Sequence, residues 1–254
     1  MEREVSLGIV DSYLNKFKEN LDVDVAIVGG GPSGLVAGYY LASYGKKVAL
    51  FERKLAPGGG MWGGAMMFNQ IMVQKDAQYI LDELGISYVS RNEHFMVDSV
   101  ESTAALIYKA TQAGVKVFNC ISFEDVVIKE DQVAGIVINW APVKREGMHV
   151  DPLIVTARSV LEGTGHDCEV AHTVARKNNV KLLTESGEVA GEKSLSIVEA
   201  ERTTIENSKQ IYPGLYVSGM AANAVAGNYR MGPVFGGMLL SGKKVADMMN
   251  KELS

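Results

Sequence analysis

The stretch VDVAIVGGGPSGLVAGYYLASYGKKVALFE, residues 23–52, contains the pattern that decides the fold. The segment Val23–Val28, apolar except for Asp24, is typical of a buried strand, and a glycine-rich turn follows it. We expect a helix from Pro32 to about Tyr44, ended by Gly45. A second strand, KKVALFE, follows at once. The order strand, helix, strand predicts a βαβ unit with parallel strands.

The turn GGGPSG matches the dinucleotide fingerprint G-x-G-x-x-G at Gly29, Gly31 and Gly34. The first glycine permits a tight turn, the second lets the backbone approach a pyrophosphate, and the third allows close packing of helix on strand. Phosphate would lie at the amino terminus of the helix, where free amides favour negative charge. Glu52 ends the second strand about 20 residues on, where a carboxylate can accept hydrogen bonds from a ribose diol. Because a carboxylate would repel a 2′-phosphate, the pattern predicts FAD or NAD.

The rest of the chain predicts one α/β domain over residues 1–254, of the Rossmann-like FAD/NAD-binding flavoprotein type. A small inserted β portion is expected as a hairpin in FEDVVIKEDQVAGIVINW, with its turn at Glu130-Asp131-Gln132. The residues TAALIYKATQAG predict a helix, and the polar segment 183–210 has no clear assignment.

An amphipathic helix is expected at about residues 4–20, ahead of the main fold. Four apolar residues recur along it at helical spacing, namely Val5, Ile9, Tyr13 and Phe17. This face could cover the sheet or meet another subunit.

Composition excludes several classes of protein. A net charge of -5 with both signs interspersed gives no basic surface, so neither nucleic acid nor a membrane is an expected partner. Two cysteines, Cys120 and Cys168, cannot form a disulfide framework, and the lack of Cys-x-x-Cys excludes a disulfide reductase. No signal sequence or long apolar run is present, so we expect a cytoplasmic protein.

The segment REGMHVDPLIV contains a histidine and a carboxylate that could bind a metal. Asp151 precedes Pro152, which favours an extended backbone, so His149 and Asp151 would project to the same face. His166 follows a GTG turn at the carboxyl end of the strand expected at 153–162. Such groups could hold a divalent metal such as Fe(II), although a single His or Asp near a turn is more often a capping or hydrogen-bonding group.

Several motifs together resemble the thiamine thiazole synthases of the Thi4 type over nearly the whole chain. They are DVAIVGGGPSGL, APGGGMWGGAMMFN, GIVINW, MHVDP, GTGHD and NYRMGPVFGGMLLSGKK. The resemblance implies that NAD is a substrate: nicotinamide is lost, ADP-ribose condenses with glycine, sulfur is added, and an ADP-thiazole carboxylate for thiamine is formed.

In fungal and plant members of this family, a cysteine two residues before the Asp-Pro pair supplies the sulfur and is consumed. His149 occupies that position here. The chain therefore resembles the archaeal branch, which uses free sulfide with Fe(II) and can turn over repeatedly. The resemblance also implies a homo-octamer with sites shared between subunits.

The family's functional residues carry over to matching positions of this chain. Asp151, from a neighbouring subunit, and His166 would bind iron, and Arg230 would hold the glycine carboxylate. The predicted contacts to the ADP part come from Ser33, Glu52, Arg53 and Gly60, with Val127 offering its main chain to adenine. The rest of the nucleotide site would be lined by His149, Val150, Asp151 and Met220.

Other activities remain open at this stage. The fingerprint alone also suits an FAD-dependent oxidoreductase, which a flavin spectrum would reveal. A ribose-phosphate isomerase is a further alternative, without a sequence feature of its own. A non-catalytic NAD-binding module is disfavoured by the motifs RMGP and MHVDP. Cys168 follows His166-Asp167 and could replace the missing sulfur donor, but we predict that it does not.

Overall fold

A largely parallel sheet forms the centre of the computed structural model, which describes residues 1–254. Its strands are β1 (Asp22–Val28), β2 (Val48–Glu52), β6 (Lys116–Asn119), β7 (Ile121–Lys129), β8 (Gln132–Trp140), β9 (Leu153–Glu162), β11 (Lys209–Tyr212) and β12 (Leu215–Val217). Strands β12, β9, β1, β2 and β6 run parallel in that order, and β11 pairs with β12 in antiparallel orientation. The predicted α/β fold with a βαβ dinucleotide unit is confirmed.

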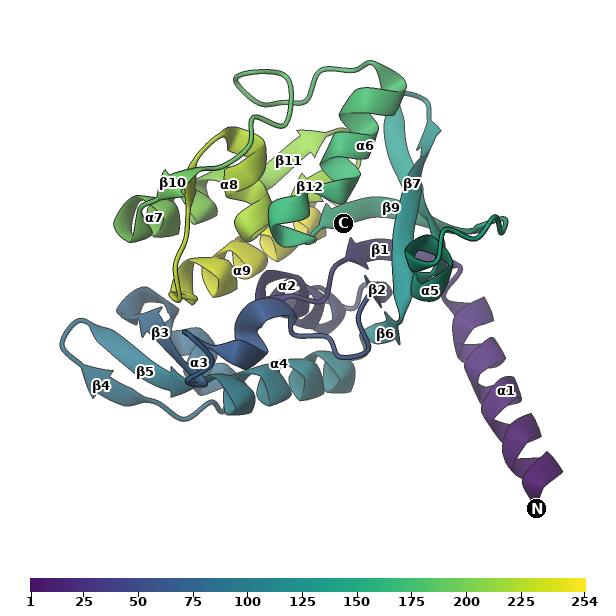
Figure 1. Cartoon of the computed structure of the whole chain (residues 1–254), viewed down its shortest axis with the longest axis horizontal. Helices are drawn as coiled ribbons and strands as arrows, with labels where there is room; N and C mark the ends of the chain where they lie inside the picture. Colours follow the sequence, from purple (N-terminus) through teal and green to yellow (C-terminus); the bar gives the residue numbers. More distant parts are fainter.

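Both faces of this sheet are covered, because successive residues of its strands point to opposite faces. Val25 and Ile27 of β1 join one core with α2, α3, α4 and α9, whereas Ala26 and Val28 join a second core with α6, α8 and the β7–β8 hairpin. Figure 1 shows α2 and α4 below the strands and α6 above them. The helices are α1 (Glu2–Glu19), α2 (Pro32–Ser43), α3 (Gln78–Leu84), α4 (Ser99–Ala113), α5 (Ala141–Arg145), α6 (Glu169–Asn178), α7 (Ile197–Asn207), α8 (Met220–Ala226) and α9 (Gly236–Glu252).

The predicted hairpin is the β7–β8 pair, and it belongs to the main sheet because β8 pairs with β9. Its turn residues Glu130 and Asp131 both have positive φ angles, of 51° and 58°. Two positive φ angles in succession are typical of the tight turns whose twist matches that of the strands.

Two smaller sheets lie outside the main one. Strands β3 (Gln70–Gln74), β5 (His94–Asp98) and β4 (Val89–Arg91) form an antiparallel sheet, and β10 (Lys193–Leu195) pairs with β13 (Tyr229–Arg230) in parallel. The unassigned polar segment 183–210 thus contains β10 and α7. Helix α4 begins at Ser99, earlier than expected, because the Asp98 carboxylate accepts hydrogen bonds from the amides of Val100 and Glu101 at 2.8 and 2.9 Å.

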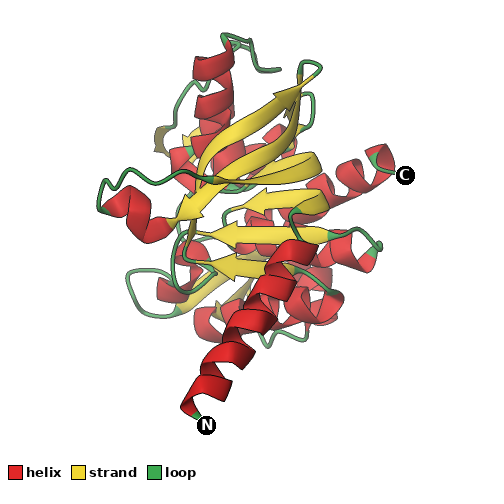
Figure 2. Ribbon diagram, turned by 90° about the vertical axis from the view of Figure 1, so that its right-hand side faces the viewer, coloured by secondary structure: helices red, strands yellow, loops and turns green.

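The N-terminal helix α1 projects away from the body of the molecule (Figures 1 and 2). Near its carboxyl end Phe17 is buried and stacks on Tyr13, and both rings contact Phe118 of β6. Val5 and Ile9, from the same predicted apolar face, are 55% and 65% exposed. Only the carboxyl-terminal half of this apolar face, with Tyr13 and Phe17, therefore packs on the sheet. No helix of the protein is both long and apolar enough to span a membrane.

Candidate functional site

A pocket of about 360 Å³ lies at the carboxyl ends of β1, β2 and β9, and we call it the strand-end pocket. The open edge of a doubly wound sheet is where such folds bind nucleotides. Eight residues predicted for the nucleotide or metal line it: Gly29, Gly31, Ser33, Glu52, Arg53, Gly60, His166 and Met220. These eight residues come from five separate chain segments and meet at one sheet edge.

The three fingerprint glycines have different surroundings, and the first two line the pocket. Gly29 has a φ of +100°, and a Cβ there would lie 2.3 Å from the carbonyl oxygen of Gly163. A Cβ on Gly34 would lie 2.4 Å from the Gly29 carbonyl oxygen, so helix and turn require the smallest residue. Gly31 lines the pocket, and a Cβ there would meet nothing within 4 Å. The first and third glycines therefore permit close packing, and the second leaves its backbone open to a ligand.

Glu52 is buried and already binds the glycine loop through its carboxylate. One oxygen accepts a hydrogen bond from the Gly30 amide and the other from the Lys54 amide, both at 2.8 Å. These bonds tie the end of β2 to the turn after β1. Because a carboxylate has about four acceptor sites, Glu52 can still accept bonds from a ribose.

The loop after β2 folds back over the fingerprint turn and supplies Gly60 to the pocket. Gly58 donates its amide to the Gly30 carbonyl at 2.6 Å, and the indole of Trp62 donates to the Pro57 carbonyl at 2.7 Å. A short 3-10 helix at Gly59–Gly63 follows, and its Met61 packs into the core with α2 and α4.

Charged side chains surround the mouth of the pocket. Arg53 pairs with Asp167 at 2.7 Å and with Glu169 at 2.6 Å, and Lys144 reaches Glu169 at 3.2 Å. Asp167 and Glu169 follow β9, so these pairs join the ends of β2 and β9. Half of the Arg53 side chain remains exposed to solvent.

His166 stands beside a carboxylate on the pocket wall. Its Nδ1 lies 2.7 Å from Oε1 of Glu192, and the imidazole is about half exposed. A carboxylate can only accept, so Nδ1 carries the hydrogen and the neutral ring presents the Nε2 lone pair elsewhere. Such a ring can bind a metal or accept a proton through Nε2.

Arg230 lies on β13, outside the strand-end pocket but next to it. It lines an adjoining depression with Glu192 and Lys193, and Met231, Gly232 and Phe235 line both cavities. We call this depression the Arg230 hollow. Glu192 lines this hollow together with Arg230 and also contacts His166, so the guanidinium and the imidazole share this carboxylate as a neighbour.

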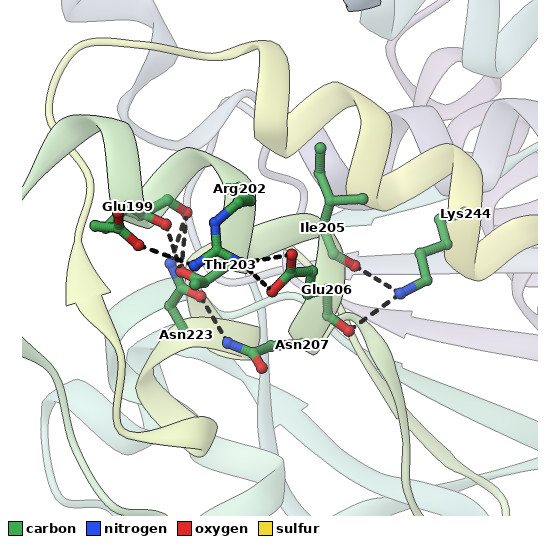
Figure 3. A network of polar contacts seen from close by, with 9 residues as sticks. Glu199, Arg202, Thr203, Ile205, Glu206, Asn207, Asn223 and Lys244 are labelled. Atoms are coloured by element: carbon green, nitrogen blue, oxygen red, sulfur yellow. Dashed lines mark hydrogen bonds and ion pairs between the residues drawn. The ribbon is translucent and has the colours of Figure 1, made fainter.

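A network of polar contacts joins Asn207, Asn223 and Lys244 to their neighbours (Figure 3), and a further bond from Asn223 reaches the segment that carries Arg230. Asn223 of α8 donates to the Ala200 carbonyl at 2.9 Å and to the Tyr229 carbonyl at 3.2 Å, and it accepts from Asn207 at 3.0 Å. Lys244 of α9 donates to the Ile205 carbonyl near the end of α7 at 2.7 Å. The network therefore joins α7, α8 and α9 immediately beside β13.

The other predicted residues do not line the strand-end pocket. Val127 lies within β7, whose Ile121 and Phe123 contribute to the pocket instead. His149, Val150 and Asp151 lie in the exposed loop before β9, whereas His166 follows β9. The ten residues of β9 extend about 30 Å at roughly 3.3 Å per residue. Within one chain no group of three or more His, Cys, Asp and Glu side chains is arranged to hold a metal.

Comparison with known proteins identifies the family. The model of the Thi4 family matches residues 6–235. The chain belongs to the Thi4 family. A thiamine thiazole synthase of Desulfosudis oleivorans is 53% identical over 96% of this chain and 95% of the relative, and one of Methanothermobacter thermautotrophicus is 53% identical over 98% and 97%. The crystal structure of Thermovibrio ammonificans THI4 is 52% identical, with a TM-score of 0.98 over 100% of this chain and 98% of that one. These likenesses support a role in thiamine thiazole biosynthesis.

Within this Thi4 fold, Cys168 and Glu162 are buried structural groups. The thiol donates to the Gly165 and Ala221 carbonyls, and burial raises its pKa. Glu162 is fully buried, and burial raises its pKa as well, yet it accepts bonds from the amides of Val170 and Ala171 at the start of α6. Neither side chain lines the strand-end pocket.

Sequence reasoning missed two carboxylates beside predicted site residues. Glu169 pairs with Arg53, and Glu192 contacts His166. Glu169 could have been found from its position just after the GTGHD motif at a helix start. Glu192 carries no such signal, because it lies 26 residues from His166 in the unassigned polar segment.

Proposed function

We propose that this protein is a sulfide-dependent thiamine thiazole synthase, which makes ADP-thiazole carboxylate from NAD, glycine and free sulfide with Fe(II). The observation that carries the sulfide dependence is His149, at the position where the fungal and plant relatives have the donor cysteine. An imidazole has no sulfur to give. The protein would therefore survive its reaction and act as a true catalyst, in the cytoplasm.

NAD would bind in the strand-end pocket, with its pyrophosphate over Gly31 at the amino terminus of α2. Free amides and the helix dipole stabilise anions there. Glu52 would accept bonds from the adenosine ribose, and Arg53 would meet the ADP part after exchanging one of its carboxylate partners. The exposed half of Arg53 and its position at the pocket mouth support this role.

Arg230 would hold the carboxylate of glycine. Its planar guanidinium suits a carboxylate in a bidentate pair. Arg230 pairs with no carboxylate of its own chain, and its hollow joins the strand-end pocket. A glycine held there would present its amino group toward the sugar of the nucleotide.

The residues suit a divalent iron only when a second copy of the chain takes part. His166 meets one requirement, because an imidazole that binds metal through one nitrogen usually donates the other N–H to a carboxylate. Asp151 would come from the exposed loop of a neighbouring subunit, since β9 separates the two residues within one chain. When bound, Fe(II) would supply Lewis acidity and orient sulfide.

An assembly with shared sites, a homo-octamer by family resemblance, is consistent with the exposed apolar side chains of this protein. Two groups of them lie on α1 and around the Asp151 loop: Val5, Leu7, Ile9, Val10 and Leu14, and Met148, Val150, Leu153 and Ile154. Clusters of exposed apolar side chains are typical of surfaces that bind other subunits.

The proposal predicts multiple turnovers that depend on added sulfide. In an anaerobic assay with NAD, glycine and Fe(II), product should accumulate well beyond one equivalent per chain only when sulfide is supplied. The intact protein mass should stay unchanged, and Cys168→Ala should retain the activity because the thiol is buried and poorly ionised. Product formation without sulfide, with a mass loss equal to hydrogen sulfide mapped to Cys168, would contradict the proposal.

A further inference from the structure

We infer that Glu192 is a positioning residue that fixes the tautomer and direction of the His166 imidazole and aligns it with Arg230. The inference rests on the proposed function where it concerns metal binding. The contact that carries it is the 2.7 Å hydrogen bond between Nδ1 of His166 and Oε1 of Glu192.

No other hydrogen bond or ion pair holds the His166 ring. The residue lies in a single 3-10 turn, Gly165–Asp167, and its ring makes no hydrogen bond besides the one to Glu192. The side chain is 49% exposed, so without that bond the imidazole could adopt other rotamers and either neutral tautomer. Glu192 therefore decides which nitrogen carries the hydrogen.

Glu192 itself is firmly held. Its neighbours donate main-chain hydrogen bonds on both sides, from Gly191 to Ala224 and from Lys193 to Asn228, each at 2.9 Å. Its side chain is only 18% exposed. Covering a carboxylate is unfavourable unless it finds a partner, and a partly exposed pair of polar side chains contributes little to stability. The arrangement is thus better explained by orientation of His166 than by stabilisation of the fold.

The same segment connects His166 to Arg230. Strand β10 begins one residue after Glu192 and pairs with β13, where Leu195 lies opposite Arg230. The Ser196 amide also donates to the Arg230 carbonyl at 3.2 Å. A displacement of Glu192 would therefore shift the imidazole relative to the guanidinium, and with them the metal site relative to the glycine site.

A spectroscopic experiment on the metal-free, full-length protein tests the tautomer. With 15N-labelled histidine, the four imidazoles can be observed at a pH well above the ordinary histidine pKa of about 6.5. His166→Ala assigns the relevant signals. We expect His166 to be the Nδ1–H tautomer in the wild type and in Glu192→Gln, whose amide oxygen still accepts. In Glu192→Ala the Nε2–H tautomer should become populated. An unchanged His166 spectrum in Glu192→Ala would overturn the inference.

Co(II) binding provides a second readout, since its visible spectrum reports the ligands directly. We expect Glu192→Ala to weaken Co(II) binding about 10- to 100-fold and to alter the spectrum, with much of the affinity restored in Glu192→Gln. Glu188→Ala is the matched control, because that exposed glutamate lies in the same segment and its side chain makes no hydrogen bond or ion pair. Equal affinity in Glu192→Ala and the wild type would also refute the inference.

The two proposals fail separately. If the wild type binds Co(II) no more tightly than His166→Ala, the metal site of the proposed function is wrong, and the tautomer measurement still decides the role of Glu192.

Discussion

The two ends of β9 differ in how far the side chains around them are held by contacts within one chain. At its carboxyl end, the fingerprint turn, Glu52, Arg53 and His166 meet around one pocket, and each is held by contacts within the chain. At its amino end, His149 and Asp151 lie in an exposed loop bordered by apolar side chains. Residues of one chain are sufficient to form the strand-end pocket, whereas the proposed metal site requires a second copy of the chain.

The strongest test of this difference is complementation between two inactive variants. Asp151→Ala and His166→Ala should each reduce turnover by more than about 100-fold, since even groups that only orient metal ligands contribute 10- to 100-fold. Co-expressed with different affinity tags and purified through both, the mixed assembly should regain activity. Some of its sites would combine an intact Asp151 with an intact His166.

The control for complementation is Asp151→Ala co-expressed with the double variant Asp151→Ala/His166→Ala. No assembly of those chains contains an intact Asp151, so activity should stay at the level of the single variants. If the first mixture also remains inactive, the shared site is refuted.

Substitution of two glycines of the fingerprint, Gly29 and Gly31, separates packing from ligand binding at the strand-end pocket. Gly29→Ala should destabilise the protein by about 2–4 kcal/mol, because the residue has positive φ and its Cβ would lie 2.3 Å from a carbonyl oxygen. Gly31→Ala should change stability by less than about 0.5 kcal/mol and weaken NAD binding about tenfold, because its methyl group would project into the pocket. Denaturant unfolding and NAD titration without glycine or sulfide measure both effects. Equal destabilisation by the two substitutions would contradict these roles.

The last expected effect concerns stability alone and lies away from both ends of β9, at Glu201 of α7. Burial raises the pKa of this carboxyl to about 7, and its oxygen accepts a bond from the Gly237 amide at 3.1 Å. The folded state therefore holds the proton more tightly than the unfolded state does, and stability falls as pH rises from about 4.3 to about 7. Thermal unfolding measured across this pH range should show that the stability of the wild type falls more steeply with pH than that of Glu201→Gln. Parallel curves would exclude this group as the cause.

Local pattern was sufficient for much of the fold and for one part of the site. The fingerprint glycines, the strand before them and Glu52 lie within 30 residues, so steric rules and strand alternation predict their arrangement. The early start of α4 could also have been read from Asp98, a frequent N-cap residue. The prediction of a single folding domain remains a prediction.

The sequence by itself determined the α/β class, the glycine-rich turn after β1 and the histidine at position 149, because these depend on residue type and short spacing. Tertiary structure alone decided that Glu192 meets His166, that Arg230 borders the strand-end pocket, and that Asp151 lies at the far end of a strand from His166. Such contacts join residues far apart in the chain, and they follow from how the sheet and its helices pack, which spacing along the sequence does not encode.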